Sequence, residues 1–307
     1  MKINLGYACV SKTLNVTSST PFTYTEFLKT NDFNKLDRII NSNLEDLEKI
    51  LYYNIKNNIT FFRLTSKLIP LATKKDVVFD YVNNYKEEFN KLKPLIKQLR
   101  VDVHPDQFTV LNSVSSEVVK NSIDNLEYHY NILNLLGIEN KIIILHVGSS
   151  TFGKKNSITR FINNFNLLPD HLKKSIAIEN DDKVFNIKDC LYIANTLNIP
   201  FVLDYHHYIC NNDKENLYEY MEKIFNTWKI KPKIHFSSPK SKLKKEFRSH
   251  HDYIDVNSFI NFLENIKFLN KDFDIMLEVK AKDEALFKLI RQLKYNNYTI
   301  KGTTIYL

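Results

Sequence analysis

The stretch VDVHPDQF, residues 101–108, places a histidine directly after a short β-branched run and then turns through a proline. Asp106, Gln107 and Phe108 follow on that turn before apolar residues resume. A single buried run that ends in a residue such as His104 is ordinary. About eight runs along this chain end in a similar way, and that recurrence predicts both the fold and the site.

Short apolar runs alternate with amphipathic stretches over the whole sequence. Apolar residues spaced three and four apart predict helices over 35–57, 116–136, 257–268 and 283–293, and Gly137 is a typical helix stop. The predicted strands are Ile3–Tyr7, Thr60–Leu64, Arg100–Val103, Lys141–His146, Ser175–Glu179, Phe201–Asp204, Lys233–Phe236 and Asp274–Val279.

Strands that alternate with helices imply a parallel sheet with right-handed crossovers. Eight such units in 307 residues match a closed (β/α)₈ TIM barrel. Because no linker or shift in composition divides the chain, we predict one catalytic domain over residues 1–307. A doubly wound open sheet is the alternative.

The composition indicates a folded protein, with 43% hydrophobic and 25% charged residues. No apolar stretch is long enough for a membrane span, and the N-terminus lacks the apolar core of a signal peptide. Cys9, Cys190 and Cys210 are too scattered for a disulfide framework, so we expect a cytoplasmic protein. The net charge of +8 favours a polyanionic partner, although a lysine-rich composition also occurs without one.

Metal-binding residue types end most of the predicted strands. In a parallel barrel these ends meet at one face, where carboxylates and imidazoles are costly to crowd together without a cation. Taken singly, each residue could instead be a loop contact or a cap. The residues are His104, His146, Glu179, Asp204, His235 and Glu278, with His206 and His207 directly after the sixth strand.

The mixture of ligands indicates which metals are expected. Oxygen and imidazole ligands without thiolates suit Mn²⁺, Zn²⁺ or Fe²⁺, and their number favours two or three ions, as in phosphodiester cleavage. Lys233 lies two residues before His235 and so points to the same side of its strand. It could be neutral, carbamylated, or extended to the rim of the barrel.

Eight stretches resemble, in order, the signature sequences of UV damage endonucleases, from about residue 2 to about residue 290. The resemblance implies a TIM barrel of the xylose-isomerase and endonuclease-IV type. It also implies a manganese-dependent centre of three ions, with Mg²⁺, Zn²⁺ or Co²⁺ as alternatives, and no organic cofactor. It also implies incision of double-stranded DNA immediately 5′ to cyclobutane dimers and 6-4 photoproducts, which leaves a 3′-hydroxyl. The stretches are GYAC, VHPDQF, LHVGSSTFGKK, AIENDD, VLDYHH, KIHFSS, HHDYID and MLEVKAKDEAL.

The resemblance also assigns roles to residues. Catalytic roles fall to Lys233, which matches the family's modified lysine, and to Glu179, Asp204 and Glu278. The metal ligands it implies are His104, His146, Glu179, Asp204, His207, His235, His250 and Glu278, with His251 as an alternative to His250.

Three residues match positions that contact the lesion. Gln107 and Phe108 match a pair inserted into the duplex, and Tyr7 matches a tyrosine near the lesion pocket. The family usually has tyrosine at the position of Phe108 and asparagine at that of Ser11.

Lysines supply candidate phosphate contacts. They are Lys154, Lys155 and the run KSKLKKEFR at 240–248, which could equally be a solvated loop. We expect a monomer, because a duplex must reach the mouth of the barrel. The alternatives are a metal-dependent sugar isomerase or epimerase on the same barrel type, and a nucleic-acid-binding protein with an inactive site.

Overall fold

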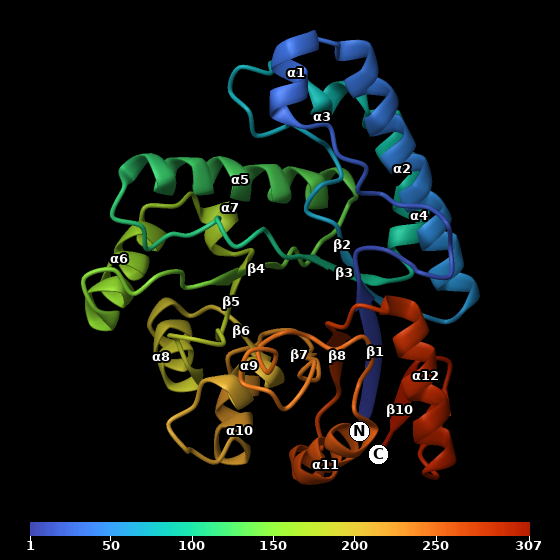
Figure 1. Cartoon of the computed structure of the whole chain (residues 1–307), viewed down its shortest axis with the longest axis vertical. Coiled ribbons are helices and arrows are strands. Elements are labelled where there is room, and N and C mark those ends of the chain that lie inside the picture. Colours follow the sequence, from blue (N-terminus) through green and yellow to red (C-terminus); the bar gives the residue numbers. More distant parts are fainter.

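The computed structural model describes all of residues 1–307, and its parallel strands form a closed ring (Figure 1). Each strand pairs with the next, and β1 pairs with both β2 and β8. The prediction of a TIM barrel is therefore confirmed, and an open sheet is excluded because the ring has no free edge. The strands are β1 Lys2–Ala8, β2 Phe61–Leu64, β3 Arg100–Val103, β4 Ile143–His146, β5 Ile176–Glu179, β6 Phe201–Asp204, β7 Lys233–Phe236 and β8 Phe273–Leu277.

Helices surround the ring, and the four predicted from spacing are present (Figure 1). They are α2 Phe33–Lys56, α5 Ser116–Leu135, α11 Val256–Ile266, which a 3-10 turn η1 Lys267–Leu269 extends, and α12 Lys282–Tyr295. None of the helices combines the length and apolar character needed to span a bilayer. The remaining helices are α1 Tyr24–Thr30, α3 Tyr81–Asn84, α4 Lys86–Ile96, α6 Lys154–Asn166, α7 Asp170–Lys173, α8 Ile187–Leu197, α9 Tyr205–Cys210 and α10 Tyr218–Asn226.

The ends of α5 illustrate how local sequence sets a helix. The Ser115 side chain accepts a hydrogen bond from the backbone N–H of Val118 and so caps the first turn. Gly137 follows the last turn at a φ of 72°, a left-handed conformation that glycine adopts without strain. The predicted stop at Gly137 is therefore confirmed.

A hairpin that the sequence did not predict completes the barrel wall. β9 (Thr299–Lys301) and β10 (Thr304–Tyr306) form this hairpin, and β10 pairs antiparallel with the start of β1. Because β1 pairs with β2 only at its carboxyl end, through Tyr7 and Ala8, the hairpin occupies the gap at the amino end. The strands are three residues each and partly polar, which hides them from a pattern search.

Strand alternation divides the apolar residues into an outer and an inner set. The outer set forms a core of 70 buried residues between the strands and the helices. The inner set is small, and its members are Ile142, Ile144, Ala177, Val202 and Trp228 in one cluster and Ala8, Phe61 and Met276 in another. Towards the carboxyl ends the inward positions become polar and charged, which places a polar site at that mouth of the barrel.

Candidate metal centre

Glu179, the last residue of β5, lies at the centre of the converging side chains. Its Oε2 lies 2.9 Å from Nε2 of His104 and 3.8 Å from Nε2 of His146. Its Oε1 lies 2.8 Å from Nδ1 of His235. Since Glu179 is fully buried, these imidazoles are its main polar surroundings, and strands β3, β4, β5 and β7 meet at this carboxylate.

Two groups of ligand atoms are close enough to hold a cation. Within each group the ligand atoms lie within 4.8 Å of one another. Glu179 belongs to both groups, so its carboxylate would contribute a ligand atom at each site. The first group is His104, His146 and Glu179, and the second is Glu179, Asp204, His235 and Glu278.

Asp204 provides the test of whether these residues fit a cation. It ends β6 and caps α9, because its Oδ1 accepts the backbone N–H of His207 at 2.7 Å. Its other oxygen, Oδ2, is buried and has no hydrogen-bond partner. A buried carboxylate oxygen without a partner is costly, and coordination to a divalent cation would remove that cost. The donor set of carboxylates and imidazoles fits such an ion.

Two of the histidines are oriented by backbone carbonyl groups. Nδ1 of His207 lies 2.9 Å from the carbonyl oxygen of Asn180, and Nδ1 of His104 lies 2.8 Å from that of Pro105. Each ring therefore donates through Nδ1 and leaves Nε2 for a ligand, an arrangement typical of metal-binding histidines.

His206 is built differently from its neighbour His207. Its Nε2 lies 2.8 Å from the carbonyl oxygen of Phe247, and its Nδ1 lies 3.0 Å from Oγ of Ser237. Both ring nitrogens are therefore engaged, and the ring is fully buried. His206 packs the loop over β7, and it belongs to neither group of ligand atoms.

The structure gives different surroundings to His250, which the sequence motif favoured as a ligand, and to its alternative His251. The ring of His250 lies 6.2 Å from that of His207, measured between centroids. His251 is exposed and its Nδ1 accepts the backbone N–H of Tyr253. His250 is thus the residue that extends the cluster at its edge, although it belongs to neither compact group of ligand atoms.

A charged layer lies directly beneath the ligand cluster. Nη1 of Arg63 lies 2.5 Å from Oε1 of Glu278, and Nε of Arg63 lies 3.1 Å from Oδ1 of Asp102. Lys233 donates a hydrogen bond to the other oxygen of Asp102. All of these side chains except that of Glu278 are buried, so Lys233 does not extend to the rim of the barrel.

Arg63 and Asp102 were given no role from the sequence. Each is a charged residue inside an otherwise apolar strand, FFRL and RVDV, which was the available signal. Asp102 lies two residues before His104, so strand alternation places both on the inner face. The same spacing had singled out Lys233 beside His235.

The ion pairs keep the carboxylates charged. Burial acts to raise the pKa of Glu179, but His235 and His146 outweigh it and hold that pKa well below its usual range. Burial likewise acts to raise the pKa of Glu278, but Arg63 and His235 outweigh it and lower that pKa. The carboxylates of Glu179 and Glu278 are therefore ionised at neutral pH, the form that coordinates a cation.

Gln107 and Phe108 lie on an exposed turn that follows β3. The Asp106 side chain accepts the backbone N–H of Phe108 at 2.9 Å and so closes the turn. Phe108 is 76% exposed and is not part of the core, and Gln107 is exposed beside it. Both side chains are therefore accessible at the face where the ligands converge.

Tyr7 does not lie at this face, so the expectation that it lines a lesion pocket is not supported by its position. It projects from the outer side of β1 into the core and is fully buried. Its hydroxyl donates to Oδ1 of Asn54, on α2, at 2.8 Å. With no surface in the mouth of the barrel, Tyr7 is placed as a packing residue.

Ser11 is also buried, and its partner is now defined. Its Oγ donates to Oδ2 of Asp283 at 2.8 Å and accepts the backbone N–H of Leu14 at 3.1 Å. Asp283 also accepts the backbone N–H of Lys12 at 2.5 Å. Ser11 therefore holds the loop after β1 against α12.

Several of the candidate phosphate-binding residues are engaged in ion pairs. Lys154 lies 2.5 Å from Asp189, and Lys240 lies 2.5 Å from Glu246. Among these candidates, the exposed lysines with no carboxylate within ion-pair distance are Lys155, Lys242, Lys244 and Lys245.

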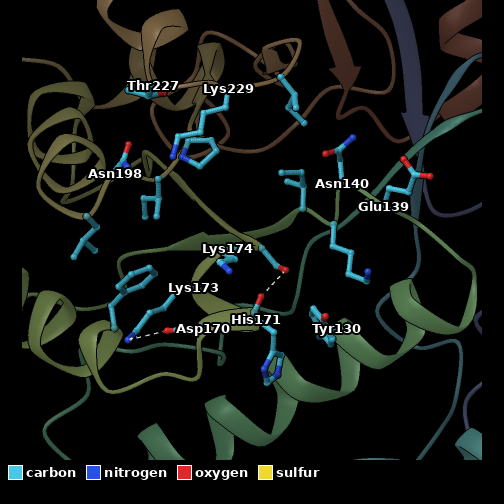
Figure 2. Close-up of a pocket in the computed structure, with 18 of the residues that line it drawn as sticks. Tyr130, Glu139, Asn140, Asp170, His171, Lys173, Lys174, Asn198, Thr227 and Lys229 are labelled. Atoms are coloured by element: carbon cyan, nitrogen blue, oxygen red, sulfur yellow. Dashed lines mark hydrogen bonds and ion pairs between the residues drawn. The ribbon is translucent and has the colours of Figure 1, made fainter.

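A separate cavity lies at the opposite end of the barrel. It has a volume of about 990 Å³ and is lined by residues that precede β4 to β7, among them Lys141, Ser175 and Pro200. Figure 2 shows an ion pair between Asp170 and Lys173 at its edge. None of the predicted site residues lines it, so this cavity is separate from the metal centre.

Comparison with known proteins places the chain among DNA repair enzymes. Residues 3–304 match the family described as UV-endonuclease UvdE. The chain is 41% identical over 303 residues to the UV DNA damage endonuclease of Bacillus cereus (strain B4264), covering 95% of each. It is 40% identical over 303 residues to that of Bacillus mycoides (strain KBAB4), again covering 95% of each.

Solved structures agree with this comparison. The crystal structure of SacUVDE superposes with a TM-score of 0.87 at 35% identity, covering 96% of this chain and 99% of that one. Endonuclease IV from Thermus thermophilus matches with a TM-score of 0.58 at 13% identity, covering 95% and 99%. The 3-keto-D-glucoside 4-epimerase YcjR from E. coli matches with a TM-score of 0.59 at 13% identity, covering 95% of this chain and 99% of that one. At such low identity, the endonuclease IV and epimerase structures show the barrel type alone.

Proposed function

Because the chain belongs to the UV-endonuclease UvdE family, we propose that it is a DNA repair endonuclease that cuts immediately 5′ to UV photoproducts. The substrates are duplexes with cyclobutane dimers or 6-4 photoproducts, and the products carry a 3′-hydroxyl. The observation that carries the proposal is the position of Glu179, shared by two groups of buried ligands. The family match favours this function over that of a sugar isomerase or epimerase on the same barrel type.

Divalent cations, with Mn²⁺ proposed, are held by the converging side chains. The unpartnered Oδ2 of Asp204 and the shared carboxylate of Glu179 support this assignment. When bound, such ions neutralise charge at the scissile phosphate and act as Lewis acids. The proposed ligands for three ions are His104, His146, Glu179, Asp204, His207, His235, His250 and Glu278.

Residues around the ligands set their positions. Arg63 fixes Glu278 through the 2.5 Å contact, and the carbonyl group of Asn180 fixes the ring of His207. Lys233 is proposed as a catalytic residue, and its burial lowers its pKa to about 7 against the opposing effect of Asp102. A substantial fraction of Lys233 is therefore neutral at pH 7, the form that reacts with CO₂ to give a carbamate.

The duplex is proposed to bind across the mouth of the barrel at the carboxyl ends of the strands. The protein is proposed to act as a monomer, with the whole barrel as one catalytic domain. Gln107 and Phe108 enter the helix at the lesion, where the bases are already poorly stacked. Phe108 stacks on a base without the hydrogen bond that a phenol would add. Lys155 and the exposed lysines of the 240–248 loop contact phosphates.

A strand-specific incision assay tests the proposal. The substrate is a duplex oligonucleotide with one thymine dimer, labelled in turn at each end of each strand, with an undamaged duplex as control. We expect a single cut directly 5′ to the dimer in Mn²⁺ and none after chelation with EDTA. Equal cutting of the undamaged duplex, or a cut at another position, would refute the assignment.

A further inference from the structure

Phe152 is an exposed aromatic residue on the loop that follows β4, between His146 and α6. Its ring is 74% exposed and belongs to no part of the core. Because the loop follows the carboxyl end of a barrel strand, it lies at the same face as the metal centre. Isolated apolar residues at a surface are common, so exposure alone assigns no role to Phe152.

The backbone at Phe152 is unfavourable for a residue with a side chain. Its φ is 61°, in the left-handed region that bulky residues rarely adopt, and Gly153 follows at 94°. Packing does not explain this conformation, since the ring contacts neither the core nor another aromatic ring. The turn instead holds a large apolar ring in solvent, where the ring makes no stabilising contact in the free protein.

Hydrogen bonds make this conformation rigid. The Phe152 carbonyl accepts from Nδ2 of Asn156 at 2.8 Å, and the Thr151 carbonyl accepts from Nη2 of Arg160 at 2.6 Å and from Oγ of Ser157 at 3.2 Å. Rigid loops with backbone strain are typical of functional positions, because the cost must be offset by an interaction elsewhere.

Hydrogen bonds connect the Phe152 loop to the loop that carries Phe108. Nδ2 of Asn112, on the β3–α5 loop, donates to the carbonyl oxygen of Ser149 at 2.7 Å. Nε of Arg160 donates to the carbonyl oxygen of Asn112 at 2.9 Å. The two exposed rings are therefore held on neighbouring, mutually braced loops.

Positive charge accompanies the ring. Lys155 is exposed, has no carboxylate within ion-pair distance, and lies in the first turn of α6. An apolar ring next to an unneutralised lysine suits a nucleic acid strand, which presents stacked bases beside phosphates. It suits a second protein surface less well, because no apolar neighbour of Phe152 on its own loop is exposed.

We infer that Phe152 is a second aromatic contact with damaged DNA, and that it stacks on a base which has lost its neighbour next to the lesion. The inference rests on the proposed function. Phe108 and Phe152 then hold the opened helix at two points, which selects duplexes that are already unstacked over intact ones. Lys155 contacts the adjoining phosphate.

Binding measurements separate this role from a structural one. Affinity is measured by fluorescence anisotropy on duplexes with and without a thymine dimer, with 2-aminopurine beside the dimer to report stacking. We expect Phe152→Ala to bind the damaged duplex roughly 5- to 150-fold more weakly, the range for one stacked base. Binding to the intact duplex stays unchanged, and Phe152→Trp restores the damaged affinity.

Two further variants control for folding and for exposed apolar area. Phe152→Gly relieves the left-handed strain, so it should keep or raise the melting temperature while losing affinity for damaged DNA. Leu167→Ala removes a residue that is 80% exposed at the other end of α6, and it should change nothing.

The outcomes distinguish this inference from the proposed function. If the wild-type protein prefers damaged DNA and Phe152→Ala binds it equally well, the inference is wrong and the function stands. If the wild-type protein shows no preference and does not incise, both are rejected.

Discussion

The ammonium group of Lys233, on β7, contacts the carboxylate of Asp102, on β3, inside the barrel. The pair lies one layer below Glu179 and His235. Both partners are almost completely buried. Burial is the main cause that lowers the pKa of Lys233 to about 7, and Asp102 opposes it. The pair therefore links the charge state of Lys233 to the layer that supports the ligands.

Asp102→Asn should destabilise the protein, because Arg63 loses one of its two carboxylate partners and the buried amine of Lys233 loses the carboxylate that accepts its hydrogen bond. We expect a loss of about 1–3 kcal/mol in the free energy of unfolding, measured with urea. The double variant Asp102→Asn with Lys233→Met should lose less than Asp102→Asn alone, since it also removes the buried amine. Additive losses would contradict this, and Asp170→Asn at the exposed contact with Lys173 should have little effect.

Glu179→Gln should remove metal from both groups of ligands, because the carboxylate belongs to each. We expect the bound metal, measured by mass spectrometry after dialysis, to fall and incision to drop by at least about 100-fold. Glu127→Gln, at the contact of 2.9 Å with His171 far from the mouth, is the matched control. Full metal content in Glu179→Gln would show that the cluster was assigned wrongly.

Tyr7→Phe should affect stability and leave DNA binding unchanged. Removing the hydroxyl leaves the buried Oδ1 of Asn54 without its donor, at a cost of about 1–3 kcal/mol. Thermal unfolding and affinity for a dimer-containing duplex are measured on the same preparation. Weaker binding of the damaged duplex, with an unchanged free energy of unfolding, would instead show that Tyr7 contacts the lesion.

His129 should make the protein sensitive to mild acid. It is buried in α5, and burial, assisted by His104, lowers its pKa to about 3. The unfolded chain takes up a proton near pH 6.5 while the folded protein does not, so stability is complete above pH 6.5 and falls as the pH decreases towards 3. Its contribution to stability falls by about 1.4 kcal/mol per pH unit in that range.

The comparison with His129→Phe isolates this effect from other titrating groups. Between about pH 6.5 and about pH 5 the wild-type protein should lose roughly 2 kcal/mol more unfolding free energy than the variant. Parallel losses in the two proteins would mean that His129 is protonated in the folded state.

Local sequence patterns were sufficient for the barrel and for the convergence of its ligands. Apolar runs located the strands to within two residues at every end, and Arg100–Val103 and Lys233–Phe236 agree at both ends. Parallel topology then brings every carboxyl end to one rim, whatever the distance in sequence, so His104 and Glu179 could be placed together in advance. Local periodicity and chain connectivity determine these features, and both are written directly in the sequence.

Contacts across the barrel were decided only by the tertiary structure. Lys233 and Asp102 are 131 residues apart, and their pairing depends on the register of strands that are not neighbours in the chain. The outward direction of Tyr7 and the different surroundings of His250 and His251 have the same origin. Alternation along a strand defines two faces, but packing against the rest of the molecule decides which face lies inside the barrel. A buried charged or polar side chain needs a partner, and only the closed barrel brings such partners together.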